Sequence, residues 1–411
     1  MAKRIDIYDY NRKVDVEIRS IEKSKISNRN KELIFQFKDF CFIEGLTKAR
    51  VWRLIGILKL VALRTGIEFE TAKKEELMKF VQKVQLNEKY SVWTKQVYKV
   101  VLKKFYKWLK GDNKTYPEEV SWITTNIKRS QMRLPSEEGL LTEDEIKRLV
   151  SCTDTPRDKA MVSVLYESGC RIGEIMSCRL NSITFDEYGC SLVVMGKTGS
   201  RKVRLIASTP YLANWLEHHP FKENIESPLW VNLGNKKQTL HMMYPAIRMM
   251  LRKLFLKAGV KKRFNPHLFR HSRATFLASY LTEFQMNQYL GWIQGSKMPA
   301  TYVHMSGKDV DNAILAVNGI HLDKQKKESI LQSKPCPRCK SINGYNADFC
   351  TRCGGVLDIQ TAMKIEEQKK QELVVRKGSD ELMNALIKDP AVQELLVKKI
   401  LEMGLGKNLL L

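Results

Sequence analysis

The stretch Ser191-Leu-Val-Val-Met-Gly-Lys-Thr-Gly-Ser-Arg-Lys-Val-Arg-Leu-Ile206 is where the sequence pattern changes from helical to alternating. Residues 191–195 and 203–206 have the alternation and β-branched content of strands, and the glycine-containing segment 196–202 joins them. Helical periodicity dominates on both sides of this stretch. We therefore predict a mainly α-helical protein with a small β-sheet, in which a hairpin is embedded in an α+β domain.

Working outward, the domain that contains the hairpin has a sharp start. Thr142 and Glu145 have the spacing of a capping box, and Thr155-Pro156 combines a cap residue with proline at the first helical position. Helical signals return from about residue 241 to 317, where Asn265-Pro266 gives another such start. The sequence predicts that this domain covers residues 141–320.

A second, all-helical domain is predicted over residues 21–115, after an extension at 1–20. The segment 47–64 begins at a threonine cap and ends before Gly66, while 93–109 has an apolar stripe and five lysines between its apolar positions or just after them. Those lysines are either a solvated face or a face that contacts phosphates. Residues 116–140 are irregular and are interpreted as a linker.

The net charge of the chain is +25, from 70 Lys and Arg against 45 Asp and Glu. Residues 1–134 have 30 basic and 16 acidic side chains, residues 201–300 have 16 and 4, and residues 301–411 have 17 and 14. An excess of this size indicates a polyanionic partner, and nucleic acid is the first candidate. We expect the contacts with it in the first two regions.

No apolar run approaches the roughly 20 residues needed to cross a bilayer, and the first ten residues lack the apolar core of a signal peptide. We therefore expect a cytoplasmic protein without membrane contacts. Five of the nine cysteines are scattered singly, which is typical of small buried side chains in a reducing compartment.

Four short motifs, taken in order, resemble those of the tyrosine recombinase, or phage integrase, family, in its archaeal and Xer-like form. They are Leu165-Tyr-Glu-Ser-Gly-Cys-Arg-Ile-Gly-Glu174, Gly196-Lys-Thr-Gly199, His267-Leu-Phe-Arg-His271, and Leu290-Gly-Trp292 followed ten residues later by Tyr302. Any one of their basic residues alone would pass for a surface side chain. The resemblance covers roughly residues 20–320, because the helical block is similar to the family's core-binding domain.

The resemblance implies a role for each matching residue. Tyr302 would attack a DNA phosphodiester and form a 3′-phosphotyrosine. Arg171 and Arg270 would clamp the non-bridging oxygens, Lys197 would protonate the leaving 5′ oxygen, and His267 would act as general base or hydrogen-bond partner. Trp292, at a position where the family has histidine or tryptophan, would pack and donate an N–H but could not shuttle a proton.

Some neighbours of these residues are alternatives. Lys202 competes with Lys197 for the role of general acid, and the Gly-Lys-Thr-Gly context favours Lys197. Glu174 is expected to support the Arg171 segment rather than to react. His271 and His304 lie beside motif residues, and each is expected to support a catalytic side chain or to be structural, rather than to be catalytic itself.

A cysteine quartet lies further along the chain: Cys336-Pro-Arg-Cys339 and, ten residues later, Cys350-Thr-Arg-Cys353. Two C-x-x-C knuckles place four thiolates for a tetrahedral zinc ion, and four cysteine ligands are typical of a closed, structural site. We predict a zinc ribbon at residues 334–356 and a helical tail at 357–411. The ribbon or the last helix could bind a protein partner.

Together these patterns predict a site-specific recombinase, or integrase, of a mobile element or chromosome that acts on double-stranded DNA. The family implies a homotetramer that exchanges strands through a Holliday junction and needs no cofactor for catalysis. Two alternatives are a type IB topoisomerase, which relaxes DNA with a similar set of residues, and a non-catalytic DNA-binding regulator on the same fold.

Overall fold

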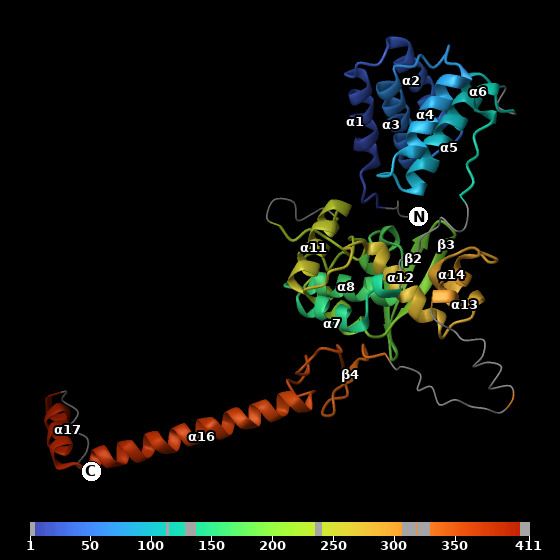
Figure 1. The fold of residues 1–411 in the computed structure, drawn as a ribbon. Coiled ribbons are helices and arrows are strands. Elements are labelled where there is room, and N and C mark those ends of the chain that lie inside the picture. Colours follow the sequence, from blue (N-terminus) through green and yellow to red (C-terminus); the bar gives the residue numbers. More distant parts are fainter. Residues whose placement is uncertain are drawn as a thin grey trace.

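The computed structural model describes residues 5–111, 115–127, 137–234, 241–305, 318 and 329–402. Figure 1 shows a bundle of helices at the top, a larger mixed α/β unit below it, a small ribbon beneath that unit, and one long helix that projects away. None of the described helices is both long enough and apolar enough to span a bilayer.

The upper bundle, which we call the helical unit, is formed by the described residues from Tyr10 to Ile123. Its helices are α1 (Tyr10–Glu22), α2 (Asn28–Ile43), α3 (Lys48–Thr65), α4 (Lys74–Leu86), α5 (Val92–Leu109) and α6 (Glu118–Ser121). The helix after Thr47 ends at Gly66, whose φ of 67° is the left-handed conformation of a helix C-cap, as predicted. Ile21 in α1 and Val120 in α6 are buried in the same apolar core as α2–α5.

The lysines of α5, together with Lys110 directly after it, contribute to the packing of the helical unit. Several of their ammonium groups reach acceptors on neighbouring segments: Lys95 with the Gln85 carbonyl, Lys103 with the Ile123 carbonyl, Lys104 with Glu44, and Lys110 with Glu119. Lys103 also lies 4.1 Å from the centre of the Tyr116 ring. These lysines therefore bind segments of the protein to one another and are not simply a solvated face.

The larger unit, which we call the mixed unit, spans residues 137–305. It contains η2 (Glu137–Gly139), α7 (Glu143–Ser151), α8 (Pro156–Ser168), α9 (Ile172–Ile175), η3 (Leu180–Ser182), β1 (Ile183–Asp186), β2 (Gly189–Gly196), β3 (Gly199–Leu205), α10 (Thr209–Glu217), α11 (Tyr244–Lys257), α12 (Pro266–Ala278), α13 (Glu283–Leu290) and α14 (Met298–Met305). The predicted capping box of Thr142 and Glu145 and the helix starts at Pro156 and Pro266 are confirmed.

The sheet is antiparallel, in the order β1-β2-β3. Pairing of β2 with β3 continues to Gly196 opposite Gly199, so the turn contains only Lys197 and Thr198. The expectation that all of residues 196–202 form the connection is therefore wrong. Gly199, with φ of 103°, allows the tight turn, and β1 was not foreseen because its four residues are mostly exposed.

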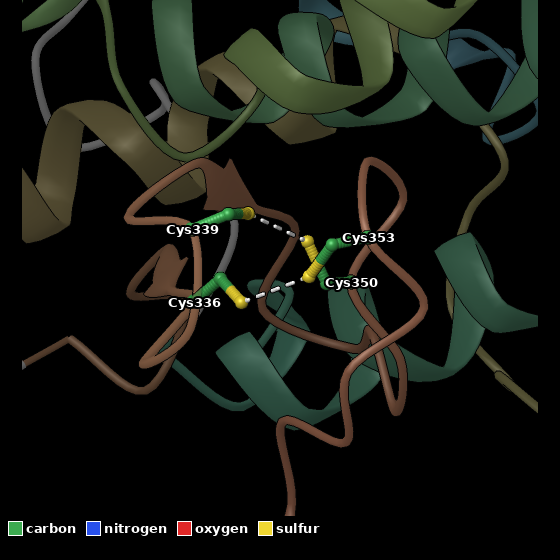
Figure 2. Close-up of side chains that lie close together, drawn as sticks. All are labelled: Cys336, Cys339, Cys350 and Cys353. Atoms are coloured by element: carbon green, nitrogen blue, oxygen red, sulfur yellow. Dashed lines mark hydrogen bonds between the residues drawn. The ribbon is translucent and has the colours of Figure 1, made fainter.

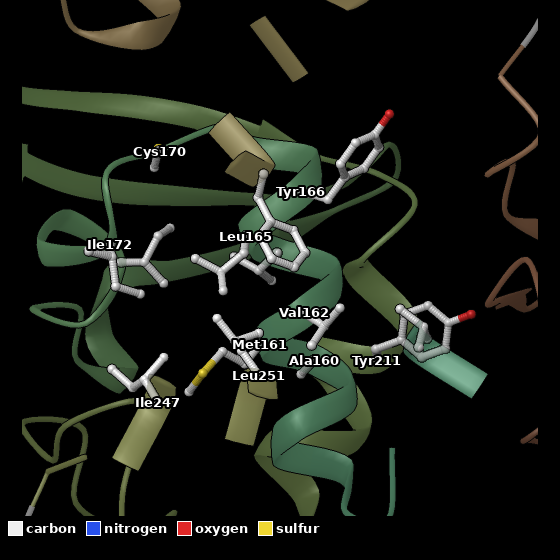
Figure 3. Close-up of a cluster of buried hydrophobic side chains, with 14 of the residues drawn as sticks. Ala160, Met161, Val162, Leu165, Tyr166, Cys170, Ile172, Tyr211, Ile247 and Leu251 are labelled. Carbon is white, nitrogen blue, oxygen red and sulfur yellow. The ribbon is translucent and has the colours of Figure 1, made fainter. Parts of the chain in front are cut away.

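The core of the mixed unit forms around α8, which is buried on nearly every side. Figure 3 shows its side chains, including Met161 and Leu165, packed among Ile172, Ile247 and Leu251 from later segments. A helix surrounded in this way fixes the position of the residues directly after its C-terminus. Those residues are the segment that contains Arg171.

The first described residues of the chain also pack into this core. Ile7 is fully buried there, and its carbonyl accepts a hydrogen bond of 2.9 Å from the backbone N–H of Tyr244 at the start of α11. The Tyr8 ring lies 4.8 Å from the Tyr244 ring. The helical unit is thus connected to the mixed unit at both of its ends, and the division of the chain near residues 20, 115 and 140 stays a prediction.

The C-terminal part begins with the ribbon, residues 334–357, which contains β4 (Lys334–Pro335) and β5 (Ile342–Asn343). It continues into α16 (Ile359–Lys388) and α17 (Pro390–Glu402). Asp389 caps α17 by accepting the backbone N–H of Ala391. The long helix α16 extends away from the rest of the molecule in Figure 1.

Candidate active site and cysteine cluster

Arg171 lies at the N-terminus of α9, directly after the loop that ends α8. Its Nη1 donates to Oε1 of Glu174 at 3.0 Å and to the carbonyl of Gly291 at 3.2 Å. Glu174 Oε2 accepts the backbone N–H of Arg171, which closes the first turn of the helix. The side chain of Arg171 is 36% exposed, so it can still meet a ligand.

Arg270 is the more deeply buried of the two arginines. It projects from α12, is 4% exposed, and donates to the carbonyls of Gly169 (3.0 Å) and Leu290 (2.8 Å). Burial, and then the charge of Arg171, lower the pKa of Arg270 to about 10, so the guanidinium stays charged at neutral pH. Two cations held near each other by backbone carbonyls form a site that favours an anion.

Two glycines allow these backbone contacts. Gly169 has φ of 56°, and Gly291 has φ of 65°, a conformation that residues with a Cβ rarely adopt. A Cβ on Gly291 would also lie 2.5 Å from Nη1 of Arg201. Glycine is therefore required at this position both for the backbone conformation and for the close approach of a buried arginine.

Tyr302, on α14, lies against the same group of side chains. It is 1% exposed, and its ring stacks on that of Trp292 at 5.5 Å and 12°. The Arg270 guanidinium lies 5.2 Å from the Trp292 ring. Burial raises the pKa of Tyr302, although the charges of Arg270 and Arg171 oppose this, so the phenol is protonated at neutral pH. Trp292 thus lies between the Tyr302 ring and the Arg270 guanidinium, in contact with both.

The two histidines of α12 differ in what they contact. His271 Nδ1 lies 2.7 Å from the Tyr302 hydroxyl. The pKa of His267 is lowered by burial and then by the positive charges of Arg270 and Arg171. His267 is thus close to the arginines, and His271 is the histidine on the tyrosine. The sequence leaves open whether His271 supports a catalytic side chain or is structural, and it does not specify this contact. The side chain of His304 lies outside the described residues.

Lys197 is exposed at the tip of the hairpin. In the described part of the chain it makes no hydrogen bond or ion pair, so the structure does not bring it into contact with the arginines. Its neighbour Gly196 lies near the site, because a Cβ on Gly196 would be 2.7 Å from Oε1 of Glu174. That oxygen is the one that accepts a hydrogen bond from Arg171. Lys202 pairs with the exposed Val193 across the sheet, on the face opposite to the buried Val203.

Arg201 is a residue of this site that the sequence motifs do not reveal. Its side chain is 10% exposed and donates to Glu174 Oε2 at 2.8 Å and to the Tyr289 carbonyl at 2.8 Å. Although burial disfavours charge on both groups, their mutual hydrogen bond raises the pKa of Arg201 and lowers that of Glu174. Strand alternation could have found it, because Arg201, Val203 and Leu205 share one face of β3.

The four cysteines of the ribbon converge, as Figure 2 shows. Their sulfur atoms all lie within 4.8 Å of one another, with Cys336 to Cys353 and Cys339 to Cys350 each at 3.6 Å. A tetrahedral zinc ion with Zn–S bonds of about 2.3 Å requires S–S separations of roughly 3.8 Å. All four thiols are free of disulfides. The cluster therefore fits a structural zinc ion.

The two knuckles are built alike. The residue after the second cysteine of each, Lys340 or Gly354, has a left-handed φ of 60° or 68°. In each knuckle the N–H of that residue donates to the carbonyl of the first cysteine, at 2.9 Å in both cases. This repeated turn directs both sulfurs of a knuckle to one side, which is what a shared metal needs.

The ribbon is docked on the mixed unit. Tyr345 is 3% exposed and belongs to the core of the mixed unit, where its ring meets that of Tyr211 at 5.4 Å and 76°. Asn346 receives a hydrogen bond from the Tyr211 hydroxyl and donates to Ser151. Gly344 has no room for a Cβ, which would lie 2.3 Å from the Tyr211 ring. The cysteine cluster therefore holds a loop that is part of the larger core.

Residues 140–308, which contain the arginines, the histidines and Tyr302, match the phage integrase family. The match covers this one domain of the chain, which is the part that contains Arg171, Arg270 and Tyr302. It is similar to tyrosine recombinase XerA of Pyrococcus horikoshii, at 22% identity over 285 residues, 69% of this chain and 93% of XerA. With tyrosine recombinase XerC of Leptospira interrogans it shares 31% identity over 154 residues, 36% of this chain and 46% of XerC. The chain thus spans about half the length of XerC.

Among solved structures, the XerH site-specific recombinase bound to its palindromic difH substrate has a TM-score of 0.52 at 17% identity. That match covers 76% of this chain and 96% of XerH. The integrase of transposon Tn1549, in complex with transposon right end DNA, has a TM-score of 0.53 at 13% identity. That match covers 70% of this chain and 99% of the integrase chain. At these identities the likeness establishes the fold, a mainly helical chain with a small sheet.

Proposed function

We propose that this protein is a site-specific DNA recombinase that cleaves and rejoins duplex DNA through a 3′-phosphotyrosyl intermediate. The observation that carries the proposal is that Tyr302 stacks on Trp292 while Arg270 lies over the same indole, inside the domain that matches the phage integrase family. A phenol beside buried, permanently charged guanidinium groups suits attack on a phosphodiester.

Arg171 and Arg270 would hold the non-bridging oxygens of the scissile phosphate. Their guanidinium groups are fixed by the carbonyls of Gly169, Leu290 and Gly291 before any DNA is present. Donors fixed in advance stabilise the charge that develops on the pentavalent phosphorane without having to reorganise. This supports electrostatic catalysis without a cofactor.

Tyr302 would be the nucleophile and Lys197 the general acid for the 5′ oxygen. The exposed position of Lys197 on a two-residue turn suits a group that reaches its partner only when DNA is bound. His267, beside the arginines, would contact the phosphate, and Trp292 would pack against the nucleophile.

Duplex DNA would contact both the helical unit and the mixed unit, because residues 1–134 and 201–300 contain most of the excess positive charge. We further propose that four protomers assemble on two DNA sites and exchange strands through a Holliday junction. In support, the fold is shared, at a TM-score of 0.51 and 13% identity, with a lambda integrase tetramer bound to a Holliday junction.

The second part of the proposal is that Cys336, Cys339, Cys350 and Cys353 hold a structural zinc ion. The sulfur geometry and the matched knuckles support it. When bound, zinc would crosslink the two knuckles and keep Tyr345 seated in the core of the mixed unit.

The first test is capture of covalent protein–DNA adducts under denaturing conditions. Protein is incubated with sheared genomic DNA of its source organism, beside the Tyr302→Phe variant, and the trapped fragments are sequenced. Adducts in wild type alone, clustered on one inverted repeat, are the expected result. Adducts without sequence preference would favour a topoisomerase, and DNA binding without any adduct would favour a non-catalytic regulator.

A further inference from the structure

The hydroxyl of Tyr302 has one histidine within hydrogen-bonding distance among the described residues, and it is His271. Nδ1 of His271 lies 2.7 Å from the hydroxyl oxygen, and the two rings are 5.9 Å apart with an angle of 30° between them. His271 follows His267 by one helical turn of α12, so both point from the same face, with ring centres 6.3 Å apart. The two histidines therefore reach different places along that face.

The groups around His271 favour its neutral form. The titratable and charged groups that face His271 are His267 and Arg270 on its own helix and Tyr302 on α14. Burial, and then the charges of His267 and Arg270, lower the pKa of His271, so the ring is neutral at physiological pH. A neutral imidazole has one ring nitrogen with a free lone pair, and a phenol whose pKa is raised has a proton to give. In the tautomer that leaves Nδ1 unprotonated, the hydroxyl of Tyr302 donates to Nδ1.

We propose that His271 is the catalytic base that accepts the proton of the Tyr302 hydroxyl during DNA cleavage. This inference rests on the proposed function and assigns the role of base to a residue other than His267. In the step, the Oη–H bond of Tyr302 breaks and the proton moves to Nδ1 of His271. The Oη electron pair forms the new bond to phosphorus, the P–O5′ bond breaks, and the 5′ oxygen takes a proton from Lys197.

Rejoining runs in the opposite direction. The 5′ hydroxyl attacks the phosphotyrosine and returns its proton to Lys197. The phenolate of Tyr302 leaves and recovers its proton from the imidazolium of His271. Each group ends as it began, so no co-reactant is consumed.

The positions of the two histidines divide the work between them. His267 is near Arg270 and Arg171, where the phosphate would lie, and in the described part of the chain it has no hydrogen bond to Tyr302. A base must lie within about 2.6–3.2 Å of the group whose proton it removes, and His271 meets that requirement. Because His271 and Tyr302 are hydrogen-bonded to each other within one chain, His271 acts on the tyrosine of its own protomer.

The test measures the rate of adduct formation on the same genomic DNA, with wild type, His271→Asn and His271→Ala. Asparagine accepts the phenol hydrogen bond but cannot take up the proton, so it separates positioning from basicity. We expect His271→Asn to bind DNA and melt like wild type and to form adducts about a hundredfold more slowly, the size typical of lost general-base catalysis. Added imidazole should restore part of the rate of His271→Ala.

His267→Ala is the matched control on the same helix. It is expected to lose adducts as well, but imidazole should not restore them, because its role is to contact the phosphate. Wild-type rates in His271→Asn would overturn the proposal while leaving the recombinase function intact. Absence of adducts from wild type would overturn both, which distinguishes the two failures.

A mixing experiment tests whether the pair acts within one chain. Tyr302→Phe keeps His271, and His271→Ala keeps Tyr302, so each variant retains one half of the pair. If both halves must belong to one chain, a mixture forms no more adduct than His271→Ala alone. Recovery of adducts in the mixture would contradict the pairing seen here and show that Tyr302 acts in a neighbour's site.

Discussion

The carboxylate of Glu174 and the guanidinium of Arg201 form a buried ion pair of 2.8 Å, with the two side chains 1% and 10% exposed. The other oxygen of the same carboxylate holds Arg171 at 3.0 Å. Arg201 also holds the carbonyl of Tyr289, just before Gly291. The position of Arg171 therefore depends on a second arginine that would not touch DNA.

Replacing Arg201 by methionine should leave the Glu174 charge buried without its main partner. Breaking a buried pair in this way costs about 3–5 kcal/mol, whereas replacing both partners costs much less. We expect Arg201→Met to lower the unfolding free energy by that amount and the double variant Glu174→Gln/Arg201→Met by less. Urea unfolding measures both, and additive losses would contradict the coupling.

The hairpin offers a clear test of which lysine is the general acid. The substrate is a DNA duplex that contains the recovered cleavage site and has sulfur in place of the bridging 5′ oxygen. Its leaving group is a thiolate, which departs without being protonated. Lys197→Ala should cleave ordinary DNA about a hundredfold more slowly and the sulfur substrate at the wild-type rate. Lys202→Ala, on the outer face of β3, should behave like wild type on both substrates.

The pH dependence of cleavage should reflect His271. Its pKa lies below the ordinary 6.5, because burial and the charges of His267 and Arg270 disfavour the imidazolium. The base is active when neutral, so the rate should be flat near pH 7 and fall only as pH drops through the lowered pKa. In His271→Asn the rate should instead rise with pH, since the raised pKa of Tyr302 then controls ionisation. Identical profiles would contradict the assignment.

Removal of zinc should destabilise the mixed unit as well as the ribbon. Purified protein is expected to contain one zinc per chain by metal analysis, and Cys350→Ser to lose it. Because Tyr345 is buried in the core, Tyr345→Ala should cost about 3 kcal/mol, near the loss for a large buried aromatic ring. Tyr188→Ala, whose ring is 67% exposed, is the control and should change the melting temperature little.

The N-terminal segment should matter to a unit far from it in sequence. Ile7→Ala removes a side chain that is 1% exposed in the core of the mixed unit, a change that costs about 2–5 kcal/mol. Ile43→Ala, at an 85% exposed position, serves as the control. Limited proteolysis should then cut the mixed unit faster in Ile7→Ala. Equal cutting in both variants would show that the segment does not hold the core together.

Much of the architecture could be predicted from local patterns. Some signals act over only a few residues and can therefore be recognised in a single sequence. They include the caps Thr142 and Asn265, the glycine after Thr65, and the paired C-x-x-C motifs. The resemblance to the family was likewise carried by short motifs. The match of residues 140–308 to the phage integrase family agrees with this resemblance, and the mainly helical fold with a small sheet is confirmed.

Other features depend on contacts between distant residues and could not be read from periodicity. The pairing of His271 with Tyr302 spans 31 positions, and that of Ile7 with Tyr244 spans most of the chain. Arginine is a residue type that is usually found on the surface. Arg201 differs from Lys202 only because it shares a face of β3 with the buried Val203 and Leu205. The functional roles of Arg171, Lys197, His267, Arg270, Trp292 and Tyr302 stay predictions that the experiments above address.

The burial of Ile7 beside Tyr244 has a consequence for how the chain folds as it is synthesised. The helical unit has its own core and can form early, but Ile7 must wait until α11 has been made. The mixed unit then closes around Ile7, which requires a very long loop and therefore a large loss of chain entropy. A helical unit that is already folded replaces the α1–α6 part of that loop, about half of it, with a compact body. It thereby shortens the loop and assists the folding of the unit with which it would grip DNA.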